Sequence, residues 1–158
     1  MIINSQITRF CIFIFIFLCF SLIERFRAAH KQKHAIIQRC HNLSIAICCQ
    51  ILLSLLFIIN GISIANLTEN YQLGLFNLLL MPNSISIIFG IIILDLAIYG
   101  QHIAMHRYPL LWRLHQVHHT DVILNATSGI RFHPLEALLS MCYRSCIILL
   151  LGLPVISV

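Results

Sequence analysis

The chain has 158 residues, of which 59% are hydrophobic and 9% are charged, and its mean hydropathy is +0.93. A soluble domain carries about 25% charged residues, so this composition argues against a water-soluble globule. It also excludes a disordered chain, which requires low hydrophobicity and high charge. Ten Lys and Arg against five Asp and Glu give a net charge of +5. The basic residues lie in polar gaps between apolar runs, which indicates membrane topology rather than a nucleic-acid partner.

The first half of the chain predicts two membrane-spanning helices. The apolar run 7–23 is long and nearly free of polar residues, which favours a membrane helix over a strand. Residues 24–42 are polar and basic, and the next apolar run, 43–65, is about one bilayer long. A further apolar run at 73–81 is too short to span, so we expect it to be interfacial or re-entrant.

The second half predicts a third span and the beginning of a fourth. Pro82-Asn83-Ser84 is a plausible helix start, and the apolar run 85–100 follows it. The fourth run begins near Cys146 and has 13 residues up to Val158. The predicted fold is therefore all-α: a polytopic membrane protein with three full transmembrane helices, a truncated fourth and a cytoplasmic histidine-rich helical segment.

The distribution of Lys and Arg predicts which side of the membrane each loop faces. Five lie in residues 24–42 and four in residues 101–145, whereas residues 66–83 contain none. The positive-inside rule therefore places the first two segments in the cytoplasm. The predicted organisation has three regions. Residues 1–94 hold the N-terminal membrane helices and the basic loop, residues 95–136 form the histidine region, and residues 137–158 are the start of a truncated helix.

Six of the nine histidines fall within residues 102–133. The first two are spaced as HxxxH, the next three as HxxHH, and the last lies in the sequence RFHPLE. Because residues three or four apart share a helix face, each motif predicts a face lined with imidazoles. Pro109 lies between the motifs and lets the chain bend, so the two faces could converge. The six residues are His102, His106, His115, His118, His119 and His133.

Converging imidazoles predict a metal site, since imidazole is the commonest side-chain ligand and suits Zn, Cu, Fe and Ni. Five or six histidines exceed the four ligands of one zinc site, so two metals are the more economical interpretation. A metal-binding histidine normally donates its second N–H to a carboxylate or carbonyl. Asp95, two turns before His102 in an apolar helix, is the first candidate for that role, and Asp121 and Glu136 are the others.

Two other kinds of metal protein fit the sequence less well. A haem protein with paired histidines would place single histidines deep inside two spans, and the first three predicted spans hold none in their apolar cores. A membrane zinc hydrolase would need a general base in an HExxH-like motif, and the sequence has none.

The stretch DLAIYGQHIAMHRYPLLWRLHQVHHTDVILNATSGIRFHPLE resembles the fatty acid hydroxylase and sterol desaturase superfamily. Members of that superfamily are integral membrane, non-haem di-iron oxygenases with histidine boxes. The resemblance implies that the HxxxH pair forms the first box, the HxxHH motif forms the second, and His133 is a further ligand. The other matching positions are Asp95, Tyr99, Trp112 and Arg113.

The resemblance implies O₂-dependent hydroxylation or desaturation of a lipid C–H bond by two iron ions, with no catalytic group apart from the metal ligands. The implied partners are a sterol or fatty acyl chain, the membrane, and an electron donor such as a cytochrome, ferredoxin or reductase. The implied location is the bacterial inner membrane or endoplasmic reticulum, with the boxes on the cytoplasmic side. The family carries a third, more C-terminal box, but no histidine follows His133. The alternative is therefore an inactive, truncated remnant of such an enzyme.

Overall fold

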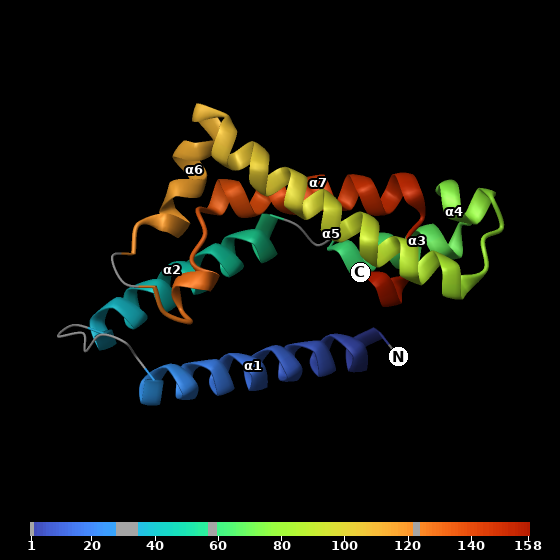
Figure 1. The fold of residues 1–158 in the computed structure, drawn as a ribbon. Helices are drawn as coiled ribbons and strands as arrows, with labels where there is room; N and C mark the ends of the chain where they lie inside the picture. Colours follow the sequence, from blue (N-terminus) through green and yellow to red (C-terminus); the bar gives the residue numbers. More distant parts are fainter. Residues whose placement is uncertain (1, 28–34, 57–59, 122–123) are drawn as a thin grey trace. The chain divides into compact units, whose positions relative to one another are not determined.

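The computed structural model describes residues 2–27, 35–56, 60–121 and 124–158, and these segments contain helices and no strands (Figure 1). The α-helices are α1 (Ile2–Arg27), α2 (Ala35–Leu56), α3 (Gly61–Asn70), α4 (Leu75–Leu78), α5 (Asn83–Arg107), α6 (Pro109–His119) and α7 (Pro134–Leu151). Two 3-10 helices, η1 (Ser128–Ile130) and η2 (Val155–Ser157), complete the described elements.

Four of the described helices are long and apolar enough to cross a membrane. An α-helix suits this task because it satisfies its backbone hydrogen bonds within one segment. The predicted all-α membrane fold is therefore confirmed. The four candidate spans are Ile7–Glu24, Ile36–Leu55, Asn83–Arg107 and Pro134–Leu151.

Two helix boundaries differ from the prediction. The apolar run 43–65 is not one span, because α2 ends at Leu56 and α3 begins at Gly61. Asn60 is the N-cap of α3, and its side-chain oxygen accepts a hydrogen bond from the Ser63 backbone N–H. An Asn at this position satisfies one of the free amides of a new helix start, which hydropathy alone did not reveal.

The fourth long helix also starts earlier than expected, at Pro134 instead of near Cys146, and has 18 residues. His133 is its N-cap and Pro134 occupies its first turn, where a proline costs no hydrogen bond. The polar residues that suggested a loop are accommodated within the helix. Glu136 is buried, and the Arg144 Nε donates to the Ser140 carbonyl.

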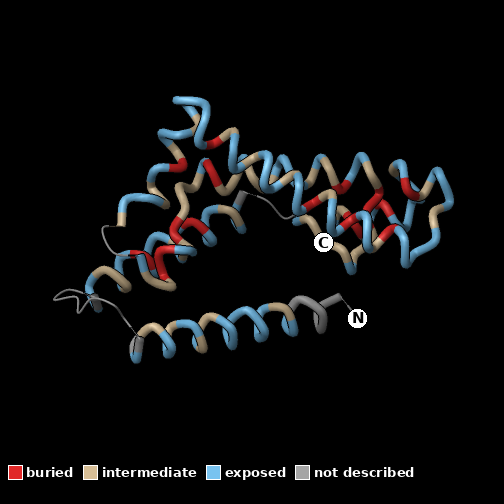
Figure 2. Tube along the Cα trace, in the orientation of Figure 1, coloured by how far each residue is buried: buried red, intermediate tan, exposed pale blue. Residues whose placement is uncertain are grey.

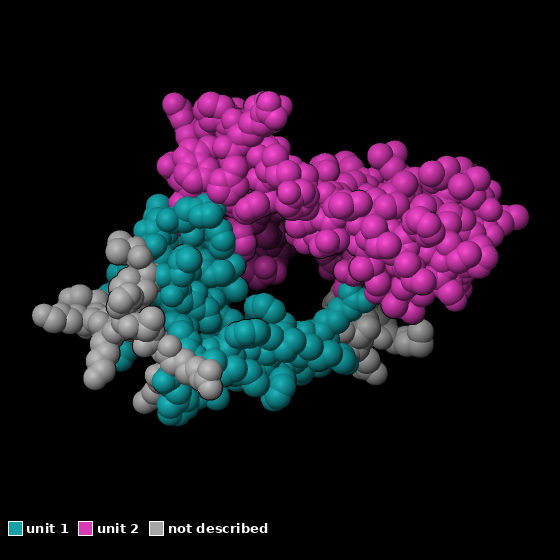
Figure 3. Space-filling view, viewed as in Figure 1, with its two compact units in different colours: residues 1–47, 118–131 teal, residues 48–117, 132–158 magenta. Residues whose placement is uncertain are grey.

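The chain forms two compact units, which Figure 3 shows in different colours. The first contains residues 1–47 and 118–131, and the second contains residues 48–117 and 132–158. Within the second unit, α3, α4, α5 and α7 enclose a small apolar core (Figure 2). The buried members of this core are Ala65, Phe76, Leu94, Ile148 and Leu153.

Two glycines allow α4 to approach the end of α7. Gly152 caps α7 in the left-handed conformation, with φ of 67°, and Gly74 precedes α4 with φ of 93°. A Cβ atom on Gly74 would lie 2.2 Å from the Gly152 backbone nitrogen. Only glycine adopts these angles without strain and leaves room for such a contact. The end of α7 is therefore held by backbone packing against α4.

Candidate metal centre

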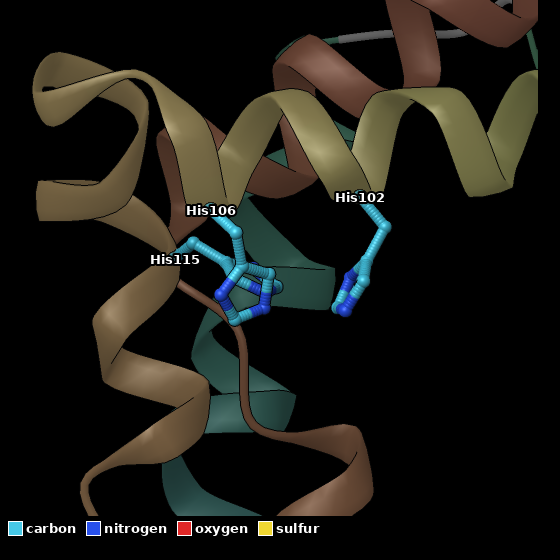
Figure 4. A group of neighbouring side chains, drawn as sticks. All are labelled: His102, His106 and His115. Carbon is cyan, nitrogen blue, oxygen red and sulfur yellow. The ribbon is translucent and has the colours of Figure 1, made fainter.

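Three of the predicted histidines converge within the second unit. His102 and His106 lie one turn apart on α5, and His115 comes from α6. One ligand nitrogen from each ring lies within 4.8 Å of the others. Figure 4 shows the three rings pointing toward the same space. The HxxxH pair therefore meets the first histidine of the HxxHH motif, in agreement with the expectation that a bend at Pro109 could bring the two faces together.

The turn between α5 and α6 makes this convergence possible. Tyr108 ends α5 in an extended conformation, with φ of −97° and ψ of 123°. Pro109 forces this change, because a residue before proline is pushed out of the helical region. Pro109 is itself the first residue of α6, where its missing N–H costs nothing. The predicted bend at Pro109 is confirmed.

The three rings form a tight aromatic group together with the chain's single tryptophan. The ring centroid of His102 lies 4.7 Å from that of His106 and 4.8 Å from that of His115. The ring centroids of His106 and His115 are 4.9 Å apart. Trp112 lies one turn before His115 on α6. Its ring centroid is 5.1 Å from that of His106 and 6.3 Å from that of His115. Trp112 therefore covers one side of the histidine cluster.

A buried carboxylate contacts the cluster from α7. The Nδ1 of His115 lies 2.6 Å from the Oε1 of Glu136, and the two side chains are 3% and 5% exposed. An ionised carboxylate at this position would accept a hydrogen bond from the Nδ1–H of His115. In the neutral imidazole this places the remaining lone pair on Nε2, which is the atom available to a metal.

The donor set fits a divalent cation. Three imidazoles and a nearby buried carboxylate combine neutral nitrogen ligands with a compensating negative charge. Nitrogens that share one ion at about 2.1 Å lie roughly 3.4 Å apart in a tetrahedral site, so the ligand nitrogens, which lie within 4.8 Å of one another, would move closer together on binding an ion. The Oε2 of Glu136 is buried and has no hydrogen-bond partner among the described residues, which leaves capacity for another donor at this place.

The other three predicted ligands are not members of this group of three. His118 and His119 occupy the last turn of α6, are counted with the first unit, and have ring centroids 5.1 Å apart. His133 caps α7, and its Nδ1 accepts a hydrogen bond from the Leu135 N–H at 3.2 Å. A neutral imidazole that accepts at Nδ1 carries its proton on Nε2. Metal binding by His133 would therefore require this cap bond to break.

Among the contacts of the described residues, Glu136 is the predicted carboxylate that touches a histidine of the cluster. Asp95 is exposed on α5 and has no hydrogen-bond or ion-pair partner in the described part of the chain. It precedes His102 by seven residues, which is about 10 Å along a helix. The role of Asp95 in orienting a metal ligand stays a prediction. Tyr99, which matches the family pattern, is likewise exposed on α5.

Asp121 belongs to a buried polar network in the first unit. Its Oδ1 accepts from the Arg131 Nη1 at 2.7 Å, and its Oδ2 accepts from the Asn42 Nδ2 at 2.8 Å and from Ser128. Burial raises the pKa of Asp121, but hydrogen bonds from Ser128, Asn42 and Gln38 and the charge of Arg131 together hold that pKa below its usual value.

Sequence reasoning missed Asn42, which is fully buried on α2 at the centre of this network. Its Oδ1 accepts from Arg131 at 2.9 Å, and its Nδ2 also donates to the Thr127 hydroxyl at 3.1 Å. The network thus holds α2 against the segment that follows the HxxHH motif. The one available signal in the sequence was the position of Asn42 at the border of an apolar run. An asparagine at such a border is not specific to a buried network.

The fold and the site together define a helical membrane protein with a histidine cluster suited to a metal. Residues 87–158 match the family model described as fatty acid hydroxylase. This matched stretch contains the three converging histidines and Glu136, and the match agrees with the resemblance carried by the histidine motifs. No curated protein and no solved structure is significantly similar to the chain.

Proposed function

We propose that the chain is a membrane-bound, non-haem di-iron oxidoreductase that hydroxylates or desaturates a C–H bond of a lipid, with O₂ as co-substrate. The observation that carries this proposal is the convergence of His102, His106 and His115 inside a segment matched by the fatty acid hydroxylase family. Imidazole suits iron, and iron supports the redox chemistry that zinc does not.

The residues of the cluster have distinct tasks in this proposal. His102, His106 and His115 hold one iron through ring nitrogens, and the iron supplies O₂-dependent oxidation of an unactivated C–H bond when it is bound. Trp112 limits the access of water on one side, because its ring packs against His106 and His115. The buried position of His115 keeps its ring in one orientation.

The second iron is proposed on the family pattern and on the number of histidines. His118, His119 and His133 are the remaining candidate ligands. His118 and His119 follow His115 at the i+3 and i+4 positions of α6, which places them on the same helix face. His133 would contribute after its cap bond to Leu135 opens.

The proposed substrate is a sterol or a fatty acyl chain, and the proposed reductant is a cytochrome, ferredoxin or reductase. Four apolar helices and the membrane-enzyme family support an integral membrane protein. A cytoplasmic position of the histidines follows from the Lys and Arg in residues 24–42 and 101–145 and their absence from residues 66–83. An acyl chain could then enter from the bilayer while the reductant approaches from the cytoplasm.

The single tryptophan offers a direct test of metal binding. The full chain, purified in detergent micelles, is titrated with Fe²⁺ or Co²⁺ without oxygen while Trp112 fluorescence is recorded. We expect saturable quenching, because the indole lies 5.1 Å from the His106 ring. The His106→Ala variant should bind at least about 100-fold more weakly, since losing a ligand costs more than losing a group that orients one. The exposed His41 on α2 supplies the control, and His41→Ala should leave the titration unchanged.

The activity is tested in a host that lacks related enzymes. Lipid extracts of cells with the wild-type chain, the His106→Ala variant and the His41→Ala variant are compared by mass spectrometry. We expect a hydroxylated or newly unsaturated lipid with wild type and His41→Ala, and none with His106→Ala. Identical lipid profiles in all three strains, with a suitable reductase supplied, would contradict the proposed activity.

A further inference from the structure

One face of α7 contacts both helices that carry the histidine cluster. Glu136 lies against His115 of α6, and Ser140, one turn later on the same face, accepts a hydrogen bond from the Gln101 Nε2 of α5 at 2.7 Å. Gln101 directly precedes His102. The two contacts therefore connect α7 to α5 and to α6 at the level of the cluster.

The two contacts differ in chemistry. The Gln101–Ser140 hydrogen bond joins two neutral side chains and touches no imidazole. The Glu136 contact is short and buried, and it acts on a ring nitrogen of a proposed ligand. A carboxylate at this position selects the Nδ1–H form of His115, whereas an isolated histidine exchanges between two neutral forms.

We propose that Glu136 is a positioning residue for the metal: it holds His115 in the form that presents Nε2 to an ion shared with His102 and His106. This inference rests on the proposed function, because it assumes that these three histidines bind one ion. It goes further by assigning the carboxylate to one particular ligand and by making the site depend on α7, which contributes no histidine side chain to the group of three.

The carboxylate has a second consequence for the site. Glu136 is 4% exposed, and its Oε2 has no hydrogen-bond partner among the described residues. A buried carboxylate oxygen without a donor is costly. A cation held by the neighbouring imidazoles offsets this cost, so Glu136 favours the metal-loaded state both through His115 and through its charge.

The test compares three variants of the full chain by Co²⁺ titration with Trp112 fluorescence. Glu136→Ala removes the acceptor, and the apparent Kd should rise by about 10–100-fold. Glu136→Gln keeps an amide oxygen that can accept from Nδ1, so most of the affinity should return. Ser140→Ala removes the neighbouring contact of α7 and should change the Kd by less than about twofold. Circular dichroism of each metal-free variant checks that the helices have formed.

A second measurement needs no substitution of Glu136. In ¹⁵N-histidine NMR spectra of the metal-free chain, the His115 signals, assigned by their loss in His115→Gln, should report a protonated Nδ1 and an unprotonated Nε2. The opposite form would overturn the proposal, whether or not Glu136→Ala folds.

The outcomes separate this inference from the proposed function. A wild-type chain that binds no Co²⁺ or Fe²⁺ refutes the metal site itself. A wild-type chain that binds metal, together with a folded Glu136→Ala variant of equal affinity, refutes only the positioning role. Equal weakening by Glu136→Ala and Ser140→Ala would also refute it, because the effect would then be a general loosening of α7.

Discussion

Replacing Arg131 with methionine should destabilise the first unit strongly, although Arg131 is not a proposed metal ligand. The side chain is 11% exposed, and its Nη1 donates to Asp121 at 2.7 Å and to the Asn42 Oδ1 at 2.9 Å. It also donates to the Thr120 hydroxyl. Methionine retains much of the apolar stem and removes every one of these donors.

The expected magnitude follows from what the substitution leaves behind. Removing one partner of a buried ion pair costs about 3–5 kcal/mol, because the other charge stays buried without compensation. The hydrogen bonds from Ser128 and Asn42, which lower the pKa of Asp121 against the effect of burial, do not depend on Arg131. Those two donors remain in the variant, so we expect the free energy of unfolding to fall by about 3 kcal/mol, which is the lower end of that range.

The assay is equilibrium unfolding in mixed micelles, followed by helical circular dichroism. The matched control is Arg144→Met, because Arg144 is exposed and, in the described part of the chain, loses one hydrogen bond, from its Nε to the Ser140 carbonyl at 3.3 Å. That variant should stay within about 0.5 kcal/mol of wild type. Combining Arg131→Met with Asp121→Asn should recover part of the loss, since the uncompensated charge is gone. If Arg131→Met and Arg144→Met have the same free energy of unfolding, the reasoning about the buried network is refuted.

Three further predictions concern packing, metal content and topology. In thermal unfolding, Gly152→Ala should lower the stability by at least about 1–2 kcal/mol, because φ is 67° and a Cβ would lie 2.3 Å from a backbone carbonyl oxygen. Gly100→Ala is the control, because a Cβ there meets nothing within 4 Å. It should stabilise α5 by roughly 0.5–1 kcal/mol. His118→Ala should lower the iron content measured by mass spectrometry from about two to about one per chain while Trp112 quenching persists, and unchanged iron content would exclude His118 as a ligand. In an otherwise cysteine-free chain, a membrane-impermeant thiol reagent added to intact cells should label Gln72→Cys but not Gln116→Cys, and the reverse pattern would invert the proposed topology.

Local patterns predicted much of the fold. Composition and run length predicted membrane helices, because a bilayer of fixed thickness requires about 20 apolar residues per span. The same reasoning misplaced the ends of α2 and α7. Hydropathy averages over a window and so concealed the cap at Asn60. It also treated Glu136 and Arg144 as loop residues, although both lie within α7, where the Glu136 Oε1 contacts His115 and the Arg144 Nε donates to the Ser140 carbonyl.

Part of the candidate site could likewise be predicted from local sequence, and the rest could not. The spacing of His102 and His106 placed them on one helix face without any tertiary information, since helical periodicity is a local property. Glu136 was among the carboxylates expected near the histidines, but its pairing with His115 depends on the packing of α7 against α5 and α6. Asn42 and Arg131 are 89 residues apart in sequence, and no local pattern links them.

The sequence by itself determined the class of protein, the set of histidines and the bend at Pro109, because these depend on hydrophobicity, helical periodicity and the geometry of proline. Only the tertiary structure decided which three histidines share one space and which carboxylate contacts them. Helical periodicity settles the directions of side chains within one helix, whereas the meeting of α5, α6 and α7 depends on contacts between residues far apart in the chain.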